Sequence, residues 1–318
     1  MMLVLTPEAL DRARHFVGTT ARPLERARLT HLVDHGSLDA VADELAAFRA
    51  DDAGGGFGHA LESDHRAPVA SVLATLTALD ILRMHGAPGD HPLVASACRW
   101  LVEHVETDAL GRRVWPFLPP EAQAWPHAPW WDQSTPGELS DTFRGYVANP
   151  GVAITAHLWR HEAASPGNVP ADLLAQLGAQ AVAVAASGLD EDEVNAHDAL
   201  AHLAAEPTVP PDVRAPVTRY LAEVLPHRVM AAPADFADYA IHPLWVAPTP
   251  SHPLASVIQA QVSVALDHTI ATQSADGSWP TFWTWGNQPD EWARAEREWR
   301  GVLVVRNVHA LLAHGRVA

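Results

Sequence analysis

Early in the chain, a short polar segment after a glycine-rich loop carries the residue types needed for acid–base chemistry. Neighbouring carboxyl and imidazole groups can shift one another's pKa or bind a cation. We assign Asp64 or Glu62 as the acid or base, with His59 as the partner that orients it. The alternative is a solvated loop that only caps the next helix. The segment contains His59, Glu62, Asp64, His65 and Arg66.

Two loops rich in tryptophan and proline supply further candidates, which we assign to substrate contact. Indole faces stabilise carbocations and also stack on sugars. The alternative is that these side chains only plug one end of a helical barrel. The first loop contributes His127, Trp130, Trp131 and Asp132, and the second contributes Tyr239, His242 and Trp245.

The remaining polar groups are interpreted as structural. The acidic run 190–193 is predicted to open a helix, where carboxylates favour the positive end of the helix dipole. His197 and His202 lack the spacing that would place them on one helical face, and Asp198 is grouped with them. The single cysteine, Cys98, rules out a multi-cysteine zinc site. The sequence therefore predicts no metal site.

The elements that must position these residues are predicted to be helices, and no convincing strand is found. Apolar residues recur at three- and four-residue spacing, and glycine or proline interrupts each run. The segments 117–150 and 236–253 are predicted to be long, ordered loops. The predicted helices cover 7–16, 23–34, 38–48, 69–84, 92–105, 153–162, 171–186, 191–205, 213–225, 257–272 and 291–314.

Composition narrows the classes of partner. The chain has 318 residues and a formal net charge of −17, which argues against nucleic acid and anionic membrane surfaces. Its cationic residues are all arginine, so a Schiff-base or P-loop lysine is excluded. No apolar run approaches the roughly 20 residues needed to span a membrane. The amino-terminal residues lack the pattern of a secretory signal, so we expect a cytoplasmic protein.

One motif near the end of the chain carries a family resemblance. Gln273, Gly277 and Trp279 follow a predicted helix in the order Gln-x-x-x-Gly-x-Trp. This resembles the QW motif of the terpene cyclase and prenyltransferase repeat superfamily, which includes squalene–hopene cyclases. Phe57 and Trp115 also follow a helix and a glycine turn, so they resemble degenerate repeats of the same unit, and we assign both to substrate contact.

The resemblance implies an all-α fold, an α/α toroid of antiparallel helical hairpins. We expect a single domain over residues 1–318, with the Trp- and Pro-rich loops at one end. It also implies a bacterial enzyme that cyclises an isoprenoid or other small apolar substrate, with a carboxylic acid starting a carbocation reaction. The family's Asp-x-Asp-Asp and Asp-Asp-x-x-Asp motifs are not intact here. Mg²⁺ would be needed only for a diphosphate substrate.

Two alternatives stay open at this point. A carbohydrate-active (α/α)-barrel hydrolase or lyase would pair Glu62 or Asp64 with Asp132 in a Trp-lined cleft. A non-catalytic toroid would bind a ligand without transforming it, because fold alone does not determine function. An apolar bound lipid would fit the cyclase or the binding protein, and a bound sugar would fit the hydrolase.

Overall fold

The computed structural model describes residues 2–50 and 54–318, and the described chain is all-α. Its regular structure consists of thirteen α-helices, four short 3-10 helices and one antiparallel pair of two-residue strands. The strands are β1 (Glu106–Thr107) and β2 (Arg113–Val114). The predicted all-α class is therefore confirmed, and the toroidal arrangement stays a prediction.

The chain packs into two compact units. Unit 1 comprises Met1–Glu44 with Ala222–Ala318, and unit 2 comprises Leu45–Leu221. Two helices cross the unit boundaries along the chain, α3 (Leu38–Ala46) and α10 (Pro211–Arg228). The single domain expected over residues 1–318 stays a prediction.

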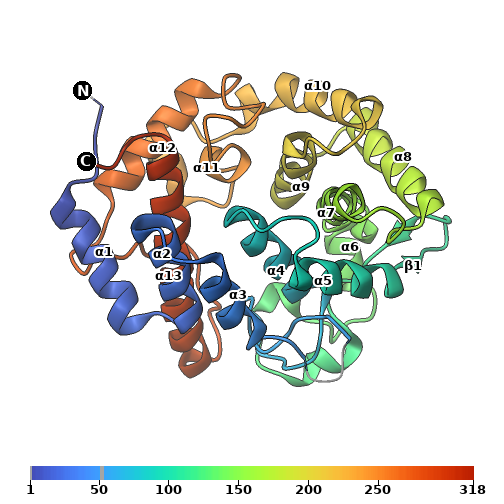
Figure 1. Ribbon diagram of the computed structural model, residues 1–318, viewed down its shortest axis with the longest axis horizontal. Helices are drawn as coiled ribbons and strands as arrows, with labels where there is room; N and C mark the ends of the chain where they lie inside the picture. Colours follow the sequence, from blue (N-terminus) through green and yellow to red (C-terminus); the bar gives the residue numbers. More distant parts are fainter. Residues whose placement is uncertain (1, 51–53) are drawn as a thin grey trace. The chain divides into compact units, whose positions relative to one another are not determined.

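Figure 1 labels the remaining α-helices. Unit 1 contains α1 (Pro7–Thr20), α2 (Pro23–Asp34), the 3-10 helix Pro233–Ala237, α11 (Pro243–Val246), α12 (Gln259–Ala271) and α13 (Pro289–Ala313). Unit 2 contains α4 (Val72–Met84), α5 (Pro92–Glu103), the 3-10 helices Pro120–Ala124, Pro129–Trp131 and Arg144–Tyr146, α6 (Glu138–Thr142), α7 (Gly151–Ala164), α8 (Ala171–Ser187) and α9 (Val194–Ala205).

Every segment predicted to be helical contains an α-helix, and side-chain caps fix several starts. The Thr6 hydroxyl accepts a hydrogen bond from Ala9 N at 3.2 Å and begins α1. The Ser71 hydroxyl does the same for Ala74 N at 3.1 Å, so α4 begins at Val72 and not at residue 69 as predicted. The two predicted loops do contain short helices, which are too short to show a helical period in the sequence.

In unit 1 the long helix α13 packs against α1, α2 and α12. The two chain ends meet in this unit, as Figure 1 indicates. Leu5 N donates to Arg316 O at 2.8 Å, and Ala318 N donates to Leu5 O at 3.0 Å. These bonds hold the terminal segments side by side.

The QW-like motif closes the end of α12. The Gln273 side chain donates to the carbonyls of Gly277 and Ala9, both at 3.0 Å. The Trp279 indole donates back to Thr269 O at 2.7 Å and is 4% exposed. Gly277 has φ +90°, and a Cβ there would lie 2.2 Å from the backbone of Arg12. The motif therefore has an architectural role, as its resemblance implied.

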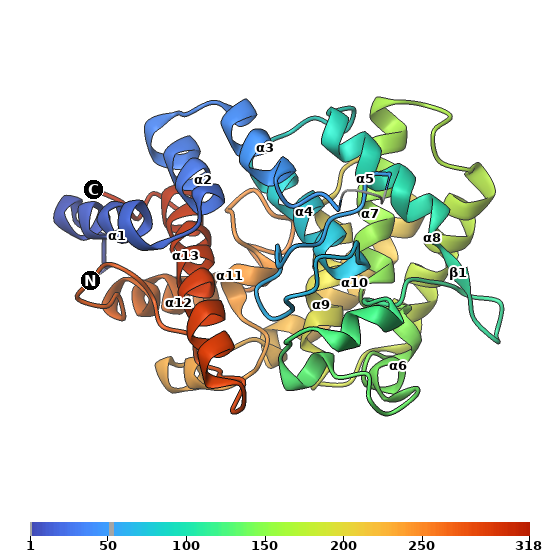
Figure 2. The same cartoon turned by 90° about the horizontal axis from the view of Figure 1, so that it is seen from below.

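In unit 2, α7 packs against α4, α5, α8 and α9 (Figure 2). Residues 151–159 of α7 are all buried, so this helix forms the centre of the unit's core. After α5, Trp115 returns its indole N–H to Leu101 O at 2.8 Å. This is the same closure that Trp279 makes on α12, so the two helix–turn–Trp segments predicted to be similar do share one structural role.

Candidate functional site

The first two candidate segments of the sequence meet in unit 2. Arg66 N donates to Pro126 O at 2.9 Å, and Ala128 N donates to Asp64 O at 2.8 Å. Between these bonds, the rings of His65 and His127 stack with their centroids 5.5 Å apart. We call Ser63, Asp64, His65 and His127 the loop cluster.

Three members of the loop cluster are buried, and two of them are incompletely hydrogen-bonded. Ser63, Asp64 and His65 are 1%, 4% and 5% exposed. His65 Nδ1 accepts a hydrogen bond from Ala67 N at 3.2 Å, which places the ring proton of the neutral imidazole on Nε2. That Nε2 and the Ser63 hydroxyl are buried without a partner.

The charge state of His65 follows from its surroundings. Burial, and secondarily the nearby His127, lower the pKa of His65 to about 4. The ring is therefore neutral at pH 7.

Aromatic side chains lie along the same loop. Trp131 N donates to Ala128 O at 2.9 Å, and the Trp131 ring stacks on Phe143 at 5.4 Å. Phe117 meets both rings edge to face. Trp131 is 7% exposed, and its indole nitrogen is buried without a partner. Trp130, next to it, is 37% exposed.

Glu62 and His59, the other two predicted catalytic residues, differ in what they contact. Glu62 accepts Asp64 N at 3.0 Å and so holds the turn together through the backbone. His59 is exposed with φ 53°, and among the described residues it makes no hydrogen bond to either acid. The orienting role predicted for His59 therefore gains no support from a described contact and stays a prediction. The buried imidazole beside Asp64 in the sequence is His65.

Asp132 lies at the edge of the loop cluster. Hydrogen bonds from Ser134 and then from Gln123 lower the pKa of Asp132 to about 2. Its side chain is 42% exposed, and His127 Nε2 is 3.6 Å from its Oδ1. Asp132 is therefore ionised at neutral pH and is unsuited to donate a proton.

Two residues assigned to substrate contact belong to the core. Phe57 and Trp115 are both 0% exposed. Phe57 N donates to Thr75 Oγ1 at 3.0 Å, and the Trp115 indole N–H donates to Leu101 O. Since protein encloses both rings completely, neither lines an open surface, and these two assignments are corrected.

The third candidate segment lies in unit 1. His242 caps α11 by accepting Leu244 N at 3.1 Å, and burial, followed by the charge of Arg306, lowers the pKa of His242 to about 3. The Arg306 guanidinium lies over the Trp245 ring, 4.6 Å from its centroid. Tyr239 is 58% exposed. These contacts give His242 and Trp245 structural roles, and no acid joins them in the described contacts.

The acidic run 190–193 is an exposed ion-pair network. Arg144 bonds Asp190 at 2.7 Å and Glu193 at 3.3 Å. Asp190 N also donates to the Glu193 carboxylate at 2.7 Å, just before α9 begins. This agrees with the interpretation as a helix start.

A second polar cluster, which the sequence did not reveal, lies on three helices of unit 2. Asp80 of α4 meets His157 of α7 and His202 of α9. His157 Nε2 is 3.0 Å from Asp80 Oδ1, and His202 Nδ1 is 3.3 Å from the same oxygen. The two rings contact edge to face at 4.4 Å. We call these three residues the helix cluster.

Burial differs strongly within the helix cluster. The side chains of His157 and His202 are 1% and 9% exposed, whereas that of Asp80 is 46% exposed. Burial lowers the pKa of His157, and burial with the charge of Arg83 lowers the pKa of His202 to about 3. Burial opposes ionisation of Asp80, but hydrogen bonds from both imidazoles outweigh it and lower its pKa. The set is thus two neutral imidazoles and one carboxylate.

Sequence spacing grouped His202 with His197 and Asp198, whereas the structure places its ring against Asp80 and His157. His197 is 0% exposed and its Nδ1 contacts Glu193 O at 2.9 Å, one turn back on the chain, so its role is structural. His202 lies more than one turn further along α9 and meets residues from two other helices. The prediction that His202 is only structural left out these neighbours.

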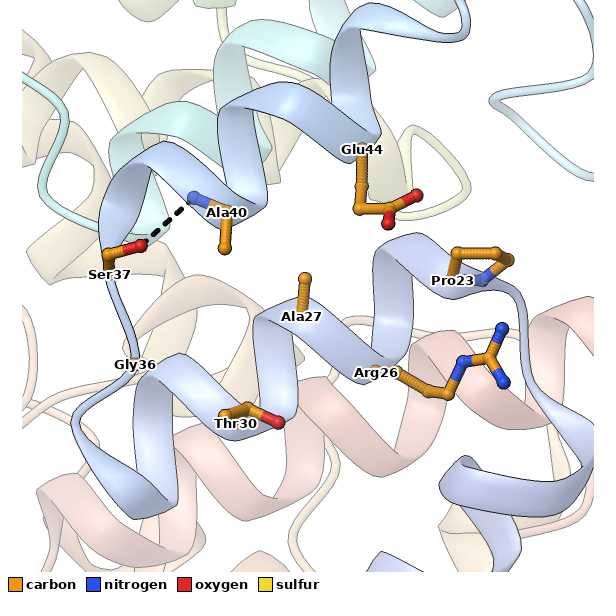
Figure 3. Close-up of a pocket in the computed structure, with 8 residues that line it drawn as sticks. All are labelled: Pro23, Arg26, Ala27, Thr30, Gly36, Ser37, Ala40 and Glu44. Carbon is orange, nitrogen blue, oxygen red and sulfur yellow. Dashed lines mark hydrogen bonds between the residues drawn. The ribbon is translucent and has the colours of Figure 1, made fainter.

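A surface hollow of about 340 Å³ lies between α2 and α3 in unit 1 (Figure 3). Ser37 Oγ accepts Ala40 N at 3.2 Å across its rim. The hollow contains none of the predicted site residues. Its lining is Pro23, Arg26, Ala27, Thr30, Gly36, Ser37, Ala40 and Glu44.

Among the described residues, no helix combines the length and apolar character required to cross a bilayer. Comparison with known proteins finds no matching family model, no significantly similar curated protein and no significantly similar solved structure.

Proposed function

We propose that the chain is an enzyme that cyclises a small, largely apolar substrate of the isoprenoid type, with the Asp64 carboxyl as the initiating acid. The observation that carries this proposal is a buried acid whose backbone is hydrogen-bonded to the loop that carries the aromatic side chains. Asp64 is 4% exposed, and its carbonyl accepts Ala128 N in the loop that carries Trp131. A carboxyl acts as a general acid by donating the proton of its neutral form.

The proposed reaction begins with proton transfer from Asp64 to one carbon of a substrate alkene. The alkene's electron pair forms the new C–H bond, and the neighbouring carbon becomes a cation. A second alkene attacks this cation and closes a ring. Loss of a proton to water ends the reaction, and solvent returns a proton to Asp64. The faces of aromatic rings such as Trp131 attract cations of this kind.

The loop cluster also offers polar contacts to one end of the substrate. The buried His65 Nε2–H and the Ser63 hydroxyl have no protein partner. If the loop opens around the substrate, they can bond a hydroxyl or diphosphate oxygen and so fix the position of an otherwise apolar chain. Mg²⁺ enters this proposal only if that end is a diphosphate.

Asp132 favours the cyclase over a hydrolase with paired carboxyls. A glycoside hydrolase needs one acid that is protonated and one that is ionised. The pKa of Asp132, about 2, suits only the ionised role, and its hydrogen bonds go to Ser134 and Gln123. Asp64 would therefore be the acid in either reaction, and a carbohydrate hydrolase gains no additional support.

The test is product analysis by mass spectrometry. The wild type is incubated with farnesyl diphosphate, geranylgeranyl diphosphate or squalene, each with and without Mg²⁺. We expect a cyclised product that Asp64→Asn reduces by about 100-fold or more, within the usual range for general acid catalysis. Product with its diphosphate retained and no need for metal would support alkene protonation.

Asp141→Asn is the matched control, since it removes an exposed carboxylate from α6 of the same unit. It should cyclise like the wild type. Absence of any cyclised product from the wild type would overturn the proposal, and so would an Asp64→Asn variant with full activity. A folded circular dichroism spectrum of each variant is required before activities are compared.

A further inference from the structure

The helix cluster of unit 2 has no part in the reaction proposed at Asp64. Its residues come from three different helices, so neither a helix cap nor a local turn explains why they meet. Asp80 lies inside α4 and His157 lies inside α7. Polar side chains brought together in this way from distant parts of a chain need a stabilising partner or a function.

The spacing of the donor atoms fits a metal ion. One ligand atom from each residue lies within 4.8 Å of the other two. Two of these separations are 3.0 and 3.3 Å, from Asp80 Oδ1 to the two ring nitrogens. Metal–ligand bonds of about 2.0 to 2.2 Å place neighbouring ligands about 3 to 3.6 Å apart, a range that includes both of these separations.

Hydrogen bonding within the protein accounts for the cluster less well. Both imidazoles approach the same oxygen of Asp80, and no hydrogen bond to its other carboxylate oxygen is found among the described residues.

The ligand types indicate which ion would bind. Imidazole nitrogen suits Zn²⁺ and Fe²⁺, and two histidines with one carboxylate leave coordination positions open for water or substrate. The 46% exposure of the Asp80 side chain gives solvent access to that open side.

Two arginines oppose a cation at the helix cluster. The positive charge of Arg83, three residues after Asp80 on α4, acts on both histidines, and that of Arg160 on α7 acts on His157. The Asp80 carboxylate offsets this charge. Arg83 Nε is buried without a partner, and its charge favours an anionic ligand such as hydroxide in the open position.

We propose that Asp80, His157 and His202 bind one divalent transition-metal ion, with Zn²⁺ as the reference ion. The site is independent of the reaction proposed at Asp64 and can be tested without a substrate.

The experiment uses full-length protein stripped of metal with a chelator. Zn²⁺ is titrated by calorimetry, and Co²⁺ is titrated by visible absorption, which reports the coordination geometry. We expect one ion per chain, and binding weakened about 100-fold or more in His157→Gln and in His202→Gln, since even the outer partners of ligands typically contribute 10- to 100-fold. His104→Gln removes an exposed histidine of the same unit and should bind like the wild type.

Two further measurements keep the proposal testable if a buried-histidine variant does not fold. Asp80→Asn changes a half-exposed ligand without changing its shape and should also lose binding. X-ray absorption of the Zn²⁺-loaded wild type should show two imidazole ligands. No 1:1 binding by the wild type would overturn the proposal. Binding that survives in folded Asp80→Asn, or a spectrum without imidazole, would overturn it as well.

Discussion

The loop cluster and the helix cluster contain the same kinds of side chain on different supports. Loop backbone holds Asp64 and His65, through hydrogen bonds to the segment that carries His127. Three packed helices hold Asp80, His157 and His202, whose contacts are side chain to side chain. The carboxylate is buried in the first cluster and half-exposed in the second. We therefore infer that Asp64 in the loop cluster is an acid shielded from water, and that Asp80 in the helix cluster is a cation ligand open to water.

If apolar packing holds the loop cluster in place, its aromatic neighbour should contribute the most to stability. Trp131→Ala should lower the free energy of unfolding by about 3 to 5 kcal/mol, the usual cost of removing a buried tryptophan. The ring is 7% exposed and contacts Phe117 and Phe143. Urea denaturation measures the change. Trp130→Ala is the matched control, because that ring is 37% exposed, and equal losses in the two variants would contradict the packing argument.

The buried His65 should make stability depend on pH. Its pKa is about 4 in the folded protein and about 6.5 when unfolded, so the unfolded chain binds more protons between these values. The stabilisation is full above pH 6.5 and is lost as pH falls toward 4, by about 3 kcal/mol at 1.36 kcal/mol per pKa unit.

Urea denaturation from pH 7 to pH 4 tests this dependence. His65→Gln should lose less stability than the wild type over this range, because the other histidines titrate equally in both proteins. His59→Gln, which changes an exposed ring, should follow the wild type. A His65→Gln curve parallel to the wild type would show that His65 is protonated without cost and that the loop cluster is open to water.

The two clusters also differ in how far sequence could find them. Asp64 and His65 are adjacent in the chain, so their residue types alone marked the loop cluster. The ring of His59 could not be separated from that of His65, because burial depends on the loop's path past His127. Helix positions were predictable from apolar spacing, and the Trp279 closure was predictable from its motif.

The helix cluster was not predictable for a physical reason. Asp80, His157 and His202 are 77 and 45 residues apart along the chain, the difference of their numbers, and each sits alone on its own helix. Packing between the helices decides which faces of α4, α7 and α9 meet. The available signal was weak: Asp80 is an acid in a run of apolar residues, between Leu79 and Ile81.

Metal addition should separate the clusters directly. At a free Zn²⁺ concentration about 100 times the dissociation constant, one-site binding raises the free energy of unfolding by about 2.7 kcal/mol. Asp80→Asn should lose this gain, and Asp64→Asn should keep it. Chemical denaturation of each protein, with Zn²⁺ or with chelator, measures the difference. A gain that disappears in Asp64→Asn instead would assign the cation to the loop cluster and reverse the comparison.

The smallest predicted effect concerns Ser71, the residue that precedes α4. Ser71 N donates to Phe57 O at 2.9 Å, and the Ser71 hydroxyl caps α4, the helix that carries Asp80. Ser71→Ala should cost about 1 kcal/mol, the typical value for a lost N-cap, and Ser71→Thr should keep most of the cap. The loss should appear in unfolding curves with the Co²⁺ spectrum of the wild type retained, because α7 and α9 still hold two ligands. If Ser71→Ala altered that spectrum, the start of α4 would control the position of Asp80, and the helix cluster would depend on local backbone structure as the loop cluster does.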